Sequence, residues 1–199
     1  MEEMQKWVDE INQEINNSGS LIDDGKEKWK KRSIFKVPSQ LKELNKNAYK
    51  PQRISFGPYH HGEAHLMAME EHKHRALIHF LKRCKKPIEL FVQRLDQVVH
   101  ELRDLYLPLD PIWMLDKSKF LQILILDGCF ILEIVRRFLN DYAYSDPVYG
   151  NDHNLMSYIL LDMLILENQI PMTVLHTLLQ VENGDEVIVL MVFSLNLLF

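Results

Sequence analysis

One stretch of the chain, residues 116–139, carries apolar side chains on most faces of a helix. A helix that is hydrophobic all round is buried, so this stretch is predicted to lie at the centre of a helical domain. Two acids, Asp127 and Glu133, interrupt the apolar run. Because unpaired acids are rare in membrane-spanning helices, we assign the stretch to a protein core.

Apolar residues recur at helical spacing on both sides of this stretch, and prolines stand near the points where such helices would begin or end. The predicted helices cover residues 64–84, 88–106, 117–139 and 153–167, with a short further helix at 172–180. We therefore predict a mainly α-helical, bundle-like single domain. Short extended segments are expected near Phe35 and Ile54, where they could pair.

The chain is predicted to consist of two parts. Residues 1–33 are expected to form an amphipathic helix followed by a basic linker, KEKWKKR at 26–32. Residues 34–199 are expected to form the main domain. Its last 13 residues, 187–199, carry no charge but fall short of the roughly 20 that cross a bilayer as a helix. We expect this tail to be a buried helix or strand.

The composition restricts the function. A formal net charge of -5 argues against a nucleic-acid partner, because affinity for phosphate backbones comes from clustered Lys and Arg. The two cysteines, Cys84 and Cys129, are too few and too isolated for a disulfide framework or a zinc site. The sequence also lacks the G-x-S-x-G, P-loop, dinucleotide-binding and H-E-x-x-H motifs. We therefore expect no cofactor.

Four separated blocks carry the most distinctive residues. They are IFKVP at 34–38, AYKPQRISFGPYHHG at 48–62, LDGCFILE at 126–133 and LENQIP at 166–171. In this order the blocks closely resemble the plant family called domain of unknown function 247. The resemblance runs from Ile34 to about Gln180 and corresponds to the N-terminal portion of a typical member.

The resemblance implies an uncharacterised plant protein without an established enzymatic activity. Full-length members often end in a single transmembrane helix at the plasma membrane, and some grass members are linked to pollen-side self-incompatibility, which implies recognition or signalling. This chain is either a truncated gene product or a short paralogue. Since it lacks a convincing transmembrane helix, we expect it in the cytoplasm.

The expected function is that of a non-enzymatic interaction or recognition module with an unknown protein partner. An anionic membrane surface is a second candidate partner. Basic residues that could contact such a surface cluster at 26–32 and at Lys82, Arg83, Lys85 and Lys86. Binding of that kind would weaken steeply with salt.

The blocks also contribute the residues that we expect to form a structural motif. These are Pro38, Tyr49, Pro51, Gly57, Pro58, Tyr59, His60, His61, Gly62, Asp127, Glu133, Asp162, Glu167, Asn168, Gln169 and Pro171. The four acids lie in predicted apolar helices, where an unpaired carboxylate costs several kcal/mol. Our hypothesis is that Asp127 or Asp162 accepts hydrogen bonds from residues 53–61, or from Lys73 and Arg75, and fastens that segment to the helical core.

Histidines suggest an alternative. Six of the nine lie between His60 and His79, and the spacing of His61 and His65 suits two metal ligands on one helix face. His60, His61 and His65 are therefore weak metal-ligand candidates, because Gly62 interrupts the pattern at the predicted helix start. The alternative function is a metal-dependent hydrolase or oxidase that uses the His60–His79 cluster and the core carboxylates.

Overall fold

The computed structural model describes residues 4–8, 12–13, 34–45, 48–138 and 153–184. The chain divides into two units, residues 1–33 and 34–199. In the first unit, residues 4–8 and 12–13 are helical and exposed. The predicted basic linker at 26–32 and the apolar tail at 187–199 lie outside the described residues.

The described part of the second unit is mainly helical, as predicted. Its helices are α2 (Ser39–Leu44), the 3-10 helix η1 (Ala64–Met69), α3 (Glu70–Cys84), α4 (Ile88–Gln97), α5 (Val99–Asp104), α6 (Pro111–Leu115), α7 (Lys117–Phe138), α8 (His153–Met163) and α9 (Met172–Asn183). Two short strands, β1 (Ile34–Phe35) and β2 (Tyr106–Leu107), complete the unit. No helix of the described residues is long and apolar enough to span a membrane.

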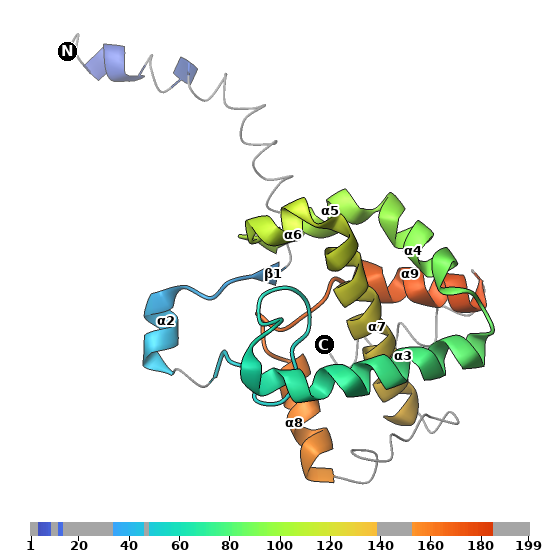
Figure 1. The fold of residues 1–199 in the computed structure, drawn as a ribbon. Helices are drawn as coiled ribbons and strands as arrows, with labels where there is room; N and C mark the ends of the chain where they lie inside the picture. The colour runs from blue at the N-terminus through green and yellow to red at the C-terminus, as the bar shows by residue number, and fades with distance from the viewer. Residues whose placement is uncertain (1–3, 9–11, 14–33, 46–47, 139–152, 185–199) are drawn as a thin grey trace. The chain divides into compact units, whose positions relative to one another are not determined.

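Helix α7 is the centre of the second unit, as its apolar sequence predicts, and it contacts α3, α4, α6 and α9 (Figure 1). Its fully buried side chains include Phe120, Leu124, Phe130 and Leu132. Burying one such side chain contributes about 2 kcal/mol. Gly128 permits the close approach of α9, because a Cβ at this position would lie 2.5 Å from the Leu178 Cδ1 atom.

The helix predicted at 64–84 has two parts. The first six residues form the 3-10 helix η1, and α3 continues from Glu70. The end of α3 is where the sequence predicts it. Lys85 adopts a left-handed conformation with φ of 54°, and its N–H bonds the Leu81 carbonyl at 3.0 Å. Pro87 then begins the turn into α4.

The prediction of one continuous helix over residues 88–106 is wrong, because the structure has two shorter helices that end before residue 106. Helix α4 stops at Gln97, and α5 runs only from Val99 to Asp104. Val98 leaves helical geometry with φ of -113° and ψ of 9°. The chain then turns into β2, whose residues need extended backbone to pair with β1.

The helix predicted at 153–167 ends early, at Met163. The following N–H groups bond three residues back instead of four. Leu164 bonds the Leu161 carbonyl at 3.1 Å, and Asn168 bonds the Ile165 carbonyl at 2.8 Å. Residues 164–168 therefore form turns and do not continue α8, because an α-helix needs bonds to the fourth residue back.

The two extended segments do not pair with each other, which corrects the sequence hypothesis. Strand β1 pairs in parallel with β2, with Ile34 opposite Tyr106 and Phe35 opposite Leu107. Ile54 is not in a strand, and its N–H donates to the side chain of Asp162. A buried side chain therefore takes the place that a neighbouring strand would occupy.

Candidate functional site

Residues 51–62, which we call the strap, form no helix or strand, yet most of them are buried. Ile54 and Phe56 are wholly inaccessible to solvent. Buried backbone N–H groups need acceptors, and an irregular segment cannot supply them to itself. Side chains from α7 and from the region of α8 supply these acceptors.

Asp162, near the end of α8, binds the start of the strap. Its Oδ1 atom accepts the Gln52 N–H at 2.8 Å. Its Oδ2 atom accepts the N–H of Arg53 at 2.7 Å and that of Ile54 at 3.0 Å. Hydrogen bonds to an ionised acceptor are stronger than neutral ones. One buried carboxylate therefore fixes three consecutive peptide units.

Asn168, in the turns after α8, binds the next part of the strap. Its side-chain oxygen accepts the Phe56 N–H at 2.7 Å. Its side-chain nitrogen donates to the Ile54 and Asp162 carbonyls, each at 2.9 Å. The amide is fully buried, and both its donor and its acceptor are used. It therefore joins the strap to the end of α8.

Asp127 of α7 binds the strap at Gly57, whose N–H donates to Oδ2 at 2.8 Å. The other oxygen, Oδ1, lies 2.7 Å from the Nζ atom of Lys73, a fully buried lysine of α3. Lys73 also pairs with Glu70 at 2.7 Å. Burial raises the pKa of Asp127, and the Lys73 charge and the Gly57 hydrogen bond oppose that rise.

The backbone approaches closely at Gly57, which needs glycine for two reasons. Its φ is 68°, a left-handed value that side chains disfavour. A Cβ atom would also lie 2.6 Å from the Gln169 carbonyl oxygen and 2.9 Å from the Tyr106 hydroxyl. That hydroxyl donates to the Gln169 carbonyl at 3.2 Å. Gln169 thus contributes its backbone carbonyl to the contact with the strap.

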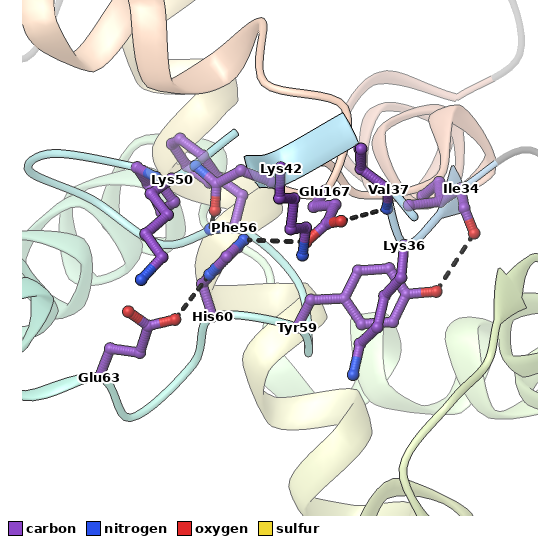
Figure 2. A network of polar contacts seen from close by, with 12 residues as sticks. Ile34, Lys36, Val37, Lys42, Lys50, Phe56, Tyr59, His60, Glu63 and Glu167 are labelled. Carbon is purple, nitrogen blue, oxygen red and sulfur yellow. Dashed lines mark hydrogen bonds and ion pairs between the residues drawn. The ribbon is translucent and has the colours of Figure 1, made fainter. Parts of the chain in front are cut away.

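Glu167 connects the strap to the segment that follows β1 (Figure 2). It accepts the Val37 N–H, and its other oxygen lies 2.8 Å from the Nζ atom of Lys42. The same oxygen lies 3.7 Å from Nε2 of His60, whose Nδ1 is 2.6 Å from Glu63. His60 is therefore placed between two carboxylates.

Tyr59 makes a second link to β1 by donating its hydroxyl to the Ile34 carbonyl at 3.2 Å (Figure 2). Its ring packs edge-on against Tyr106 of β2 at 5.5 Å between centroids. Burial, reinforced by the nearby charge of Glu167, raises the pKa of Tyr59 to about 12. The phenol is therefore a neutral donor at physiological pH.

Glu133 has a different environment from the other three acids. It belongs to a group on α3, α7 and α9 that we call the ion cluster. Its members are His79, Arg83, Glu133, Arg136 and Glu182.

In the ion cluster each carboxylate meets a cation. Glu133 lies 2.9 Å from Arg83, 3.0 Å from Arg136 and 2.7 Å from His79. Glu182 pairs with both arginines. The members of the ion cluster therefore bind one another, whereas Asp127 of α7 binds the strap.

The sequence hypothesis is that Asp127 or Asp162 accepts hydrogen bonds from residues 53–61, or from Lys73 and Arg75. In the structure both acids bind that segment, and Lys73 pairs with Asp127. Arg75 instead pairs with Glu71 at 2.7 Å. The arginines and Glu182 of the ion cluster were not predicted. The i, i+3 spacing of Glu133 and Arg136 is the sequence signal that could have indicated the ion cluster.

The remaining motif residues lie around the strap. Pro38 and Pro171 precede α2 and α9, where their fixed φ suits a helix start. Tyr49 is half-buried just before the strap, and Pro51 and Pro58 are buried within it. Gly62 ends the strap with φ of 89° and has open space where a Cβ would lie.

The three candidate metal ligands have three different neighbours. His60 contacts Glu63, while Nε2 of His65 donates to the Pro51 carbonyl at 3.1 Å. His61 packs edge-on against Trp113, and burial lowers its pKa. Among the described residues, no group of three or more His, Cys, Asp or Glu is placed to hold a metal ion.

Only part of the basic cluster near the end of α3 is available to an anionic surface. Arg83 belongs to the ion cluster, and Lys86 donates to the Val181 carbonyl at the end of α9. Lys82 and Lys85 are exposed. Two of the four predicted surface cations are therefore engaged with this chain.

Comparison with known proteins gives one family. Residues 34–197 match the model of DUF247, described as a plant protein of unknown function. The Arabidopsis thaliana protein named UPF0481 protein At3g47200 is 38% identical over 146 residues, which are 73% of this chain and 30% of that protein. Putative UPF0481 protein At3g02645, also from Arabidopsis thaliana, is 27% identical over 152 residues, 74% of this chain and 27% of that protein. This chain thus spans less than a third of either relative, and no solved structure matches it.

Proposed function

The chain belongs to DUF247, a family of plant proteins of unknown function, and we propose that it is a non-enzymatic interaction or recognition module. The proposal rests on how the chain uses its buried acids. Membrane association, which the resemblance implies for full-length relatives, stays a prediction.

The observation that carries the proposal is the engagement of the four core carboxylates. Asp127, Glu133, Asp162 and Glu167 are each at most 2% exposed. Each accepts a backbone N–H or pairs with a cation of the same chain. A general acid or base has to reach the proton that it transfers in a bound substrate. Acids buried and bonded in this way support a structural role.

The arrangement suits a binding protein for a second reason. Asp162, Asn168 and Asp127 fix the backbone of the strap at Gln52, Arg53, Ile54, Phe56 and Gly57. A segment held in one conformation loses little entropy when a partner binds to it or to its surroundings. Asp162, Asn168 and Asp127 therefore hold the strap in the one conformation that a partner would meet.

The proposal is tested with the full chain purified without a histidine tag. Metal analysis of this protein is expected to find no stoichiometric transition metal. The pure protein, used as bait in a plant extract, is expected to retain a specific partner. The double variant His60→Ala, His61→Ala should change metal content no more than the control variant His100→Ala, which alters an exposed histidine outside the His60–His79 cluster.

The opposite result would favour the hydrolase or oxidase. That result is a metal present in stoichiometric amount, retained by the His100 control and lost with His60 and His61. Failure to retain any partner from extracts of several tissues would also contradict the interaction module.

A further inference from the structure

A groove with a volume of about 300 Å³ lies between α4 and α9. Its lining includes Leu90, Gln93, Arg94 and Gln97 of α4, together with Lys86 and Gln180. The four α4 residues are spaced i, i+3, i+4 and i+7, so they share one face of the helix. Phe91 and Leu95 are buried and hold α4 in place.

The groove is cationic in a protein whose formal net charge is -5. No acidic side chain lines it among the residues that the structure describes. Two of the three neighbouring acids of α4 and α9 are engaged elsewhere, and the third, Glu89, is exposed and does not line the groove. Asp96 pairs with Lys117 at 2.7 Å, and Glu182 pairs within the ion cluster. The positive charge of the groove is therefore available to a ligand.

Arg94 has no hydrogen-bond or ion-pair partner within the described part of the chain. Lys86 donates one hydrogen bond to the Val181 carbonyl, which leaves two of its three N–H donors. A guanidinium presents a planar fork of donors that binds a carboxylate through two parallel hydrogen bonds. The two cations thus favour a carboxylate ligand.

Three glutamines give the groove a second property. Gln93, Gln97 and Gln180 likewise lack partners among the described residues. Each amide offers two donors and an acceptor, the groups that match the C=O and N–H of a peptide backbone. The described lining contains no aromatic ring on which a nucleobase could stack. The groove therefore fits a peptide better than a nucleotide.

We propose that this groove, the α4–α9 groove, binds an extended acidic peptide segment of a partner protein. Arg94 and Lys86 pair with a carboxylate of the peptide, and the three glutamines hydrogen-bond its backbone. The inference rests on the proposed function and names the chemistry of the partner. It concerns a surface separate from the strap.

The probe is a fluorescein-labelled peptide of alternating Glu and Gly, titrated with the full chain at low salt and followed by fluorescence anisotropy. The same peptide with Gln in place of Glu is the neutral control. The acidic peptide is expected to bind at least about tenfold more tightly, because only its carboxylates can pair with Arg94 and Lys86. Equal binding of the two peptides would overturn the proposal.

Arg94→Glu should weaken binding of the acidic peptide by about tenfold or more, because it places a like charge in the groove. Lys82→Glu makes the same charge change on an exposed residue outside the groove and should change the affinity less than about twofold. Equal losses of peptide affinity in the two variants would show that the peptide is attracted by the overall charge of the protein, and would overturn the assignment of the site. Circular dichroism verifies that both variants fold.

Gln93→Ala combined with Gln97→Ala should weaken binding about threefold or more if the amides bond the peptide backbone. Free glutamate should compete poorly, because it lacks that backbone. Competition by glutamate as strong as that by the peptide would overturn the peptide assignment in favour of a small carboxylate. Arg94-dependent binding to phosphatidylserine vesicles, without peptide binding, would overturn it in favour of a membrane surface.

The two proposals fail in different ways. If the wild-type chain and the Arg94→Glu variant retain a partner from plant extract equally, the proposal for the α4–α9 groove is wrong. The proposal of an interaction module then stands. If the wild-type chain retains no partner, the proposed function itself is wrong.

Discussion

The strap and the ion cluster both depend on buried carboxylates, but the partners of those carboxylates differ. Asp162 and Asp127 accept backbone N–H groups of the strap. Glu133 and Glu182 pair with the side chains of Arg83 and Arg136. In the first region the acid supplies what a β-strand would otherwise supply, and in the second it neutralises another ion.

The difference has an energetic consequence. Side-chain ions can be replaced together by apolar residues of similar size at little cost, because both charges disappear. Backbone N–H groups cannot be removed, so they need an acceptor in every variant. We therefore expect that neither Asp127 nor Asp162, which bind the strap, can be replaced by an apolar residue without a large loss of stability. The ion cluster should tolerate a coordinated apolar replacement of its ions.

The largest expected effect is that of Asp162→Ala. The variant should lose about 3 to 5 kcal/mol of unfolding free energy, because three N–H groups lose a charged acceptor and one of them is buried. Urea denaturation measures the loss. The control Asp96→Ala removes an exposed ion pair with Lys117 and should cost about 0.5 kcal/mol. Similar losses in both variants would show that Asp162 contributes no more to stability than an exposed ion pair does.

The ion cluster provides the opposing test. Glu182→Leu alone should cost about 3 kcal/mol, because it leaves the buried Arg136 with fewer anionic partners. The quadruple variant Arg83→Met, Glu133→Leu, Arg136→Met, Glu182→Leu, which removes both acids and both arginines, should return to within about 1 kcal/mol of the wild type. Urea denaturation of both variants measures this recovery. A quadruple variant less stable than the single one would contradict the comparison.

Gly57→Ala tests the close contact of the strap. It should cost about 2 to 3 kcal/mol, since the new Cβ would meet the Gln169 carbonyl at 2.6 Å in addition to the strain of a positive φ. Gly62→Ala is the matched control, because Gly62 also has a positive φ but open space around it. It should cost about 1 kcal/mol. Thermal unfolding of the two variants separates contact from backbone strain.

Tyr59→Phe should have the smallest effect at neutral pH, about 1 kcal/mol, because it removes one hydrogen bond to Ile34. The pKa of Tyr59 is raised from 10.0 to about 12 in the folded protein. Above pH 10.0 the unfolded chain releases this proton and the folded chain keeps it, so stability falls with rising pH until about pH 12. The phenylalanine variant should lose stability less steeply over that interval in urea denaturation. Equal slopes would show that Tyr59 does not contribute.

Part of this arrangement could be predicted from local sequence. The apolar run of α7 predicted its central position, and the Lys85–Pro87 sequence predicted the end of α3. The presence of Asp127 and Asp162 in apolar segments predicted that each needs a donor, since burial of an unpaired charge is costly. Periodicity also implied one helix over 88–106, but tertiary pairing of β2 with β1 ends it at Asp104.

The amino-acid sequence alone determined the helical class, the buried centre and the need of the core acids for partners, because periodicity and the cost of burying charge act locally. Only the tertiary structure decided which partner each acid binds. Glu167 bonds Val37, 130 residues away along the chain, and Glu133 joins the ion cluster while Asp127 binds the strap. Hydrogen bonds act over about 3 Å, so partners distant in sequence are selected by how the helices pack.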